Sequence, residues 1–221
     1  MFAMPFVIAV DFALRLPGIV PNMAALPVAP SVQSVEQAVL VELNRARTDP
    51  AAFARTLRDV RGYYRGNVLA RPGADATYLT QEGVVPVDEA IAFVGRETAR
   101  APLASATVLA AAAADHQAEQ RADGSIGHAG IDGSTPADRV RRHGGDIYVG
   151  ELIAYGSTDP ADIVRQLVVD DGVADRGHRR LLYDASLRYA GISCGHHPVY
   201  RYMCVVTVGR TPDGQPIRRG G

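Results

Sequence analysis

Two β-rich runs, residues 189–194 and 202–208, close the chain after a long series of helical patterns, and this order constrains the fold most. A turn-rich segment, residues 197–200, joins the two runs as in a hairpin. A third apolar run, residues 148–155, predicts another strand upstream. Helices before, between and around a few late strands indicate an α+β chain, or an α-β-α sandwich.

Helical periodicity places the remaining elements. Ser34 can cap a first helix, with Gln37 three residues later as in a capping box, and Asp49-Pro50 starts a second helix. Further helices are predicted over residues 87–100, from 105 or 106 to 121, from 136 to the glycines at 144–145, and from 160 through 167. Residues 62–86 show no clear periodicity, which predicts a long loop that can hold short strands.

Length and charge limit the domain count and the classes of partner. With 221 residues, 47% of them hydrophobic, the chain can bury the core of one domain. Its formal net charge of −1 predicts no broad attraction to nucleic acid or to an anionic membrane, and no transmembrane span is expected. We expect a folded domain over residues 34–210, after an apolar, proline-rich leader or linker (1–33) and before a short polar tail (211–221).

Two cysteines, Cys194 and Cys204, lie ten residues apart within the late β-rich region. This spacing suits the two arms of a hairpin, so we predict a disulfide, which implies an oxidising compartment. The alternative is a pair of reduced thiols in the core of a cytosolic protein. A zinc site built on these cysteines would need more thiol or imidazole ligands at short spacing.

Three polar residues stand out as candidates for chemistry. His128 lies in a glycine-rich loop, Glu151 lies inside an otherwise apolar strand, and His178 opens a short helix after a loop. A buried glutamate is costly unless it is paired or hydrogen-bonded. Two neutral imidazoles could share a divalent metal with it, or hydrogen-bond to its carboxylate. Taken singly, each residue has a plainer interpretation, because a loop histidine is usually solvated and a strand glutamate can face water.

Other polar side chains are weaker candidates. His116 lies in the middle of a predicted helix, where it is either a hydrogen-bonded core residue or a ligand. The remaining histidines, at positions 143, 196 and 197, are expected on the surface or in turns. No serine or threonine lies in a recognisable nucleophile elbow, so a covalent mechanism has no candidate.

Several segments, in the right order and at the right gaps, resemble the CAP superfamily of cysteine-rich secretory proteins, antigen 5 and pathogenesis-related proteins, in particular its bacterial branch. Residues 41–47 resemble the first-helix pattern LNxxRxx, and residues 114–118 resemble AxxHAxDM. Residues 127–140 are similar to SHxxxDGSTPxDR, residues 150–156 to GENIAxG, residues 177–182 to GHRxNIL and residues 189–192 to the late xxGVG strand. The resemblance covers residues 34–209.

The resemblance implies a three-layer α-β-α sandwich with a small, mainly antiparallel central sheet. It also implies a cleft lined by two histidines and two acids. His128, His178 and Glu151 fit three of these positions, and counting along the preceding helix puts the fourth at Asp170, with Asp171 as the alternative. The chain departs from the family pattern at Leu167, which replaces a tryptophan, and at Leu152, which replaces the asparagine of GEN.

For function, the resemblance implies a secreted or cell-envelope protein. We expect His128 and His178 to bind Zn²⁺ or another divalent cation, and the cleft to bind a small ligand, a lipid or an extracellular protein. The alternative is a metal-dependent hydrolase in which Glu151 acts as general base on water. The family has no agreed reaction, so we favour a binding module over an enzyme.

Overall fold

A computed structural model describes residues 32–72 and 77–217. Its helices are α1 (Val32–Thr48), α2 (Pro50–Arg61), α3 (Val85–Val94), α4 (Thr107–Asp123), α5 (Pro136–Arg142), α6 (Pro160–Val169) and α7 (Gly177–Leu182). Its strands are β1 (Tyr64–Arg65), β2 (Val68–Leu69), β3 (Tyr78–Leu79), β4 (Ala104–Ser105), β5 (Val149–Tyr155), β6 (Tyr189–His197) and β7 (Arg201–Gly209). The predicted leader lies outside the described residues, except that positions 32 and 33 belong to α1.

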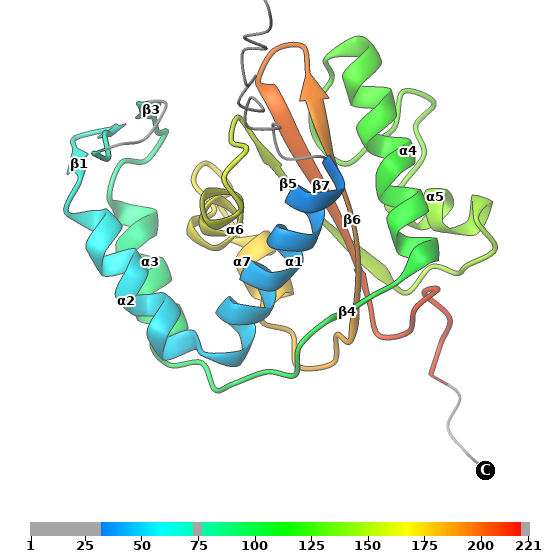
Figure 1. Cartoon of the computed structure of the whole chain (residues 1–221), viewed down its shortest axis with the longest axis horizontal. Coiled ribbons are helices and arrows are strands. Elements are labelled where there is room, and N and C mark those ends of the chain that lie inside the picture. The colour runs from blue at the N-terminus through cyan, green and yellow to red at the C-terminus, as the bar shows by residue number, and fades with distance from the viewer. Residues whose placement is uncertain (1–31, 73–76, 218–221) are drawn as a thin grey trace, which may run out of the picture.

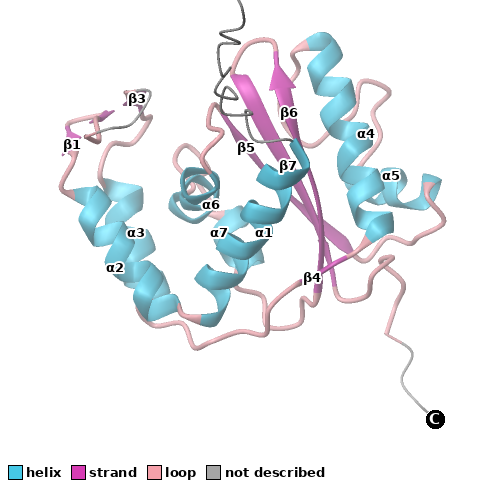
Figure 2. Ribbon diagram, viewed as in Figure 1, coloured by secondary structure: helices cyan, strands magenta, loops and turns pink. Residues whose placement is uncertain are grey.

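The central sheet has the order β4-β6-β7-β5. Strand β7 pairs antiparallel with both β6 and β5, whereas the two-residue β4 runs parallel to β6. Helices α4 and α5 cover one face, and α1, α6 and α7 cover the other, as Figure 1 and Figure 2 show. The α+β class and the three-layer arrangement with a mainly antiparallel sheet are therefore confirmed.

A second, small sheet, β1-β2-β3, occupies the region that the sequence predicts as a long loop with short strands. It lies beyond α2 and α3, which pack side by side at the outer edge of the molecule (Figure 1). No helix in the described part of the chain is both long and apolar enough to cross a bilayer.

Several predicted boundaries are wrong. Helix α1 begins at Val32, so Ser34 lies inside it and is not its N-cap. The helix predicted over residues 87–100 runs from Val85 to Val94 and ends at Gly95. Strand β6 is three residues longer than expected and reaches His197, which is buried and not a surface residue.

The hydrophobic core lies on both faces of the sheet. The larger cluster joins α1, α2, α3 and α6 to one face, and smaller clusters join α4 to the other. Helix α4 approaches β6 so closely that a Cβ atom on Gly191 would lie 1.9 Å from the backbone nitrogen of Ala110. Position 191 therefore requires glycine, because backbone cannot shift cheaply in a packed layer.

The disulfide predicted from the cysteine spacing is present. Cys194 and Cys204 are paired directly across β6 and β7, and both are buried. The bridge therefore joins the two central strands near the hairpin that connects them.

Candidate functional site

The imidazoles of His128 and His178 meet at the molecular surface between α5 and α7. His128 lies in the loop after α4, and His178 is in the first turn of α7. Their Nε2 atoms are 3.5 Å apart, and their ring centroids are 5.6 Å apart. The His128 side chain is 47% exposed and the His178 side chain 17%, so solvent and solutes reach the gap from the His128 side.

Glu151 lies beneath His128 on β5, and its side chain is 1% exposed. One carboxylate oxygen accepts a hydrogen bond from His128 Nδ1 at 2.9 Å, and the other accepts one from the Arg139 guanidinium at 2.9 Å. A buried carboxylate is tolerated where it is paired and hydrogen-bonded in this way. Because Nδ1 of a neutral His128 then holds the proton, its Nε2 carries a free lone pair.

Asp170 is hydrogen-bonded to His178 as Glu151 is to His128. It follows α6 in a left-handed conformation (φ 60°), and its side chain is 1% exposed. Its Oδ1 accepts a hydrogen bond from His178 Nδ1 at 2.8 Å, and its Oδ2 accepts one from the Arg179 backbone N–H at 3.2 Å. His178 therefore also presents Nε2 to the gap.

Asp171, the alternative for the fourth position, points elsewhere. Its carboxylate accepts hydrogen bonds from the backbone N–H groups of Gln81 and Glu82, at 2.7 Å and 2.9 Å. It therefore fastens the loop after α6 to the loop after β3, and the structure brings together His128, Glu151, His178 and Asp170 without it.

Arg139, on α5, is a residue of this site that the sequence reasoning missed. Its side chain is fully buried, and besides Glu151 it donates hydrogen bonds to the carbonyl oxygens of His128 (3.0 Å) and Ser134 (3.1 Å). It thus neutralises the carboxylate and also holds the loop that carries His128. An arginine next to the buried Val140 on a short helix was the available signal, since a charged side chain there needs a buried acceptor.

A second buried network supports the same loop from α4. His116 is fully buried, and its Nε2 lies 2.8 Å from both the Gly127 carbonyl oxygen and the Gln120 amide nitrogen, which makes it a core residue. The Tyr155 hydroxyl accepts from the Gly127 N–H at 3.0 Å and donates to Gln120 at 2.8 Å. Burial raises the pKa of Tyr155 above its usual value, so the hydroxyl keeps its proton for this bond.

The remaining histidines lie away from the gap. His143 is exposed and pairs with Asp115 at 2.8 Å, and His196 is also exposed. His197 is buried in the β6–β7 hairpin, where its Nε2 donates to the Ser125 carbonyl at 2.9 Å.

Two arginines hold the segment that carries His178. Arg179 is buried and donates to the carbonyl oxygens of Val168 and Val169, both at 2.6 Å, at the C-terminal end of α6. Arg176 donates to both carboxylate oxygens of Glu82, at 2.6 Å and 2.7 Å, and to Glu89 at 2.8 Å. The hydrogen bonds from Arg176 lower the pKa of Glu82 to about 2, and the hydrogen bond from the Gly172 N–H is the second largest cause.

The donor set at the gap consists of two imidazole nitrogens. Within residues 32–72 and 77–217, no group of three or more His, Cys, Asp or Glu side chains is arranged to hold a metal ion. The carboxylates of Glu151 and Asp170 accept hydrogen bonds from the Nδ1 atoms, and Glu151 also accepts from Arg139. Their oxygens therefore orient the imidazoles and do not point into the gap.

The comparisons with known proteins give two structural likenesses and a family. An extracellular SCP-domain protein from Bacillus anthracis str. Ames is 19% identical, with a TM-score of 0.42, over 58% of this chain and 38% of that one. An outer surface protein from Borrelia burgdorferi is 18% identical, with a TM-score of 0.40, over 48% of this chain and 76% of that one. No curated protein sequence matches. The model of the cysteine-rich secretory protein family, CAP, matches residues 43–208, and the chain belongs to this family.

Proposed function

We propose that this CAP domain binds a divalent cation, Zn²⁺ or a similar ion, between His128 and His178. The observation that carries the proposal is the pair of Nε2 atoms 3.5 Å apart, each on an imidazole whose Nδ1 is bonded to a buried carboxylate. Two nitrogens bound to one tetrahedral Zn²⁺ at 2.0–2.1 Å would lie about 3.4 Å apart. The distance between the two Nε2 atoms therefore suits a shared ion.

The protonation pattern supports the same proposal. When both rings are neutral, with each Nδ1 proton donated to a carboxylate, the two Nε2 lone pairs face the gap. Facing lone pairs repel, and a cation between them removes that repulsion. Carboxylates bonded to the far nitrogen also fix ring orientation and raise the basicity of a metal-binding imidazole.

Two imidazoles leave half of a tetrahedral coordination sphere open. When bound, the ion would supply a Lewis-acid centre with positions for water or for a ligand. We infer that a small ligand, a lipid headgroup or a side chain of an extracellular protein completes the site, and that the exposed edge of His128 marks the side of approach.

A binding role fits Glu151 better than the alternative role of general base in a hydrolase. Both of its oxygens already accept hydrogen bonds, from His128 and Arg139, and its side chain is 1% exposed. A base must reach the proton that it removes within hydrogen-bond distance. To do so, Glu151 would have to give up its hydrogen bond with His128 or its ion pair with Arg139.

Export from the cytoplasm belongs to this proposal, and the disulfide supports it. A buried Cys194–Cys204 bridge is characteristic of oxidising compartments. Fractionation of the producing cells tests it: the oxidised protein should be found in the medium or the cell envelope, and a purely cytosolic, reduced protein would contradict it.

Metal analysis tests the cation site. We expect about one Zn²⁺ per chain by elemental analysis after dialysis against trace zinc, and loss of that ion in His128→Ala and in His178→Ala. His143→Ala is the matched control, since that histidine is exposed and lies outside the gap. Absence of stoichiometric metal from the wild type, or its retention in both site variants, would refute the proposal.

Turnover measurements separate the two candidate functions. Glu151→Gln keeps the shape of the side chain and should lower zinc affinity about 10–100-fold, because it weakens the bond to His128 Nδ1. As a hydrolase, the wild type would turn over ester or peptide substrates and Glu151→Gln would lose that activity with the ion still bound.

A further inference from the structure

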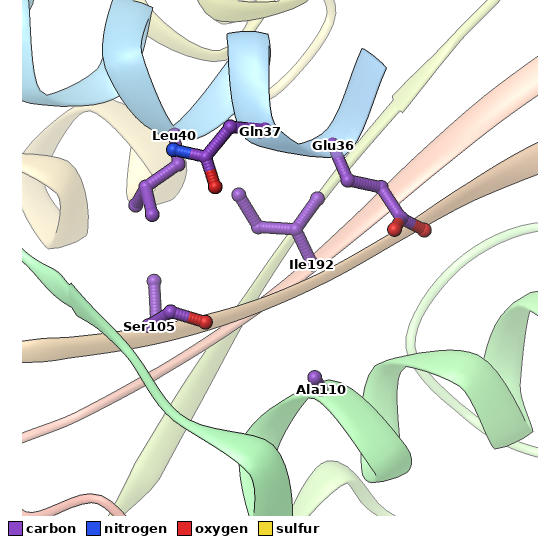
Figure 3. Close-up of a pocket in the computed structure, with 7 residues that line it drawn as sticks. Glu36, Gln37, Leu40, Ser105, Ala110 and Ile192 are labelled. Carbon is purple, nitrogen blue, oxygen red and sulfur yellow. The ribbon is translucent and has the colours of Figure 1, made fainter. Parts of the chain in front are cut away.

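A pocket of about 170 Å³ lies where β4 and β6 form the edge of the central sheet, between α1 and α4. Glu36, Gln37 and Leu40 line it from α1, Ser105 from β4, Ala110 from α4 and Ile192 from β6. Figure 3 shows the three α1 side chains pointing toward β6, with Ile192 directed up toward α1. The pocket thus combines apolar side chains with Glu36 and Gln37 on the α1 side and Ser105 on the β4 side.

Glu36 gives this pocket its chemical character. Its side chain is half-buried, and its Oε1 accepts a hydrogen bond from the backbone N–H of Cys194 at 3.0 Å. In the described part of the chain, no arginine or histidine lies within ion-pair distance of it. Burial raises the pKa of Glu36, against the opposing effect of the Cys194 bond. Since Oε1 is bonded to Cys194, the other oxygen of this partly desolvated carboxylate can accept a charge-assisted hydrogen bond from a cation.

The volume of the pocket limits the size of the cation that it can hold. A cavity of about 150 Å³ holds one benzene molecule, which has six heavy atoms. A pocket of 170 Å³ with one open side therefore suits a ligand of about that number of heavy atoms. Leu40, Ala110 and Ile192 offer apolar contact to a short aliphatic chain that extends away from Glu36.

We propose that the α1–α4 pocket binds a primary alkylammonium group, with the ammonium on Glu36 and the aliphatic chain on Ile192 and Leu40. An ammonium carries the charge opposite to that of Glu36 and has donors but no acceptor, which matches a carboxylate. A carboxylate ligand of the same length would be repelled by Glu36, and an alcohol would leave the charge of Glu36 uncompensated.

The test is an NMR titration of the full chain with n-pentylammonium chloride, followed through backbone amides. The Cys194 amide should shift and saturate, because its N–H is bonded to Glu36, and the amides of Ala110 and Ile192 should follow the same curve. Sodium chloride at matched ionic strength, n-pentanol and sodium pentanoate are the comparison titrations. We expect each of the two organic comparison ligands to bind at least tenfold more weakly than the amine.

Substitutions assign the effect to the carboxylate. Glu36→Gln keeps an acceptor for the Cys194 N–H but removes the charge, and should raise the Kd for pentylammonium at least tenfold. Glu42→Gln is the matched control on the same helix; it pairs with Arg45 at 3.6 Å outside the pocket, and its Kd should stay within twofold of wild type.

Three results would overturn the proposal: no saturable shift with the amine, equal binding of pentanol or pentanoate, or an unchanged Kd in Glu36→Gln. Should Glu36→Gln fail to fold, the comparison of the three ligands on the wild type decides alone. Because the pocket and the histidine gap share no residue, failure here leaves the metal proposal untouched.

Discussion

Replacement of Arg139 by methionine is expected to destabilise the fold by about 4–6 kcal/mol. Methionine keeps the apolar length of the side chain but removes the charge opposite Glu151, and both members of that ion pair are at most 1% exposed. Breaking a buried pair by removing one partner costs about 3–5 kcal/mol, since the other charge stays buried and uncompensated. The carbonyl oxygens of His128 and Ser134 also lose their donor, which adds about 1 kcal/mol or more.

Urea denaturation at neutral pH, followed by circular dichroism, measures this loss as a difference in the free energy of unfolding. Arg61→Met is the matched control, because Arg61 and Asp88 form an ion pair whose side chains are 49% and 47% exposed. Such exposed pairs are worth about 0–1 kcal/mol. The double variant Arg139→Met/Glu151→Leu should regain part of the loss. The reasoning is refuted if Arg139→Met costs no more than the control, or if the double variant is no more stable than Arg139→Met.

Three further variants test the packing of α4 on β6, the disulfide, and the ion pair between Arg176 and Glu82. Gly191→Ala should cost about 3 kcal/mol or prevent folding, because the added Cβ would lie 1.9 Å from a backbone nitrogen of α4; a thermal scan with near-native Tm would contradict this. Cys194→Ala/Cys204→Ala should cost about 2.5–3 kcal/mol in urea denaturation, the loop-closure entropy of a bridge with this spacing, and a loss below about 1 kcal/mol would argue against that origin. Glu82→Gln should flatten the fall in stability toward acid: Arg176 holds the pKa of Glu82 at about 2, below its ordinary value of 4.5, so its contribution is present above pH 4.5 and is lost as pH falls toward 2. If this ion pair does not stabilise the fold, the free energy of unfolding will fall with pH equally steeply in Glu82→Gln and in the wild type.

The order of helices and strands was predictable because period and composition carry it locally. The two late strands and the helices on either side follow from apolar spacing alone. Their ends depend on contacts from distant parts of the chain. The predicted helix over 87–100 stops at Val94 because the following segment is held extended: the Arg100 N–H donates to the Arg47 carbonyl, and the Leu103 N–H donates to Asn44.

The site was predictable in part for a related reason. His128, Glu151 and His178 come from three segments separated by more than twenty residues, so only the family pattern could place them together. Counting along a helix could not separate Asp170 from Asp171, since α6 ends at Val169 and the next residue turns left-handed. That turn directs the two carboxylates to different partners, which no helical register would give.

Buried arginines were the least predictable part of the site. Arg139 and Arg179 are nearly fully buried, against the usual tendency of that residue, and apart from Glu151 their acceptors are backbone carbonyls that a sequence does not reveal. Each holds one half of the site: Arg139 fixes the His128 loop, and Arg179 fixes the end of α6 that precedes His178. An arginine can satisfy several such acceptors at once because its guanidinium carries five donors in a rigid plane.

The two halves of the site meet at β5, which carries Glu151 and, next to it, Gly150. A Cβ atom at position 150 would come within 2.7 Å of a methyl carbon of Leu181 on α7, so glycine here leaves room for the Leu181 side chain against the strand. His178 begins that helix, and Glu151 holds His128 from the same strand, so β5 supports both imidazoles. Arg139 on α5 also holds the loop of His128, and support of both rings from packed elements is the arrangement that a preformed ion site requires.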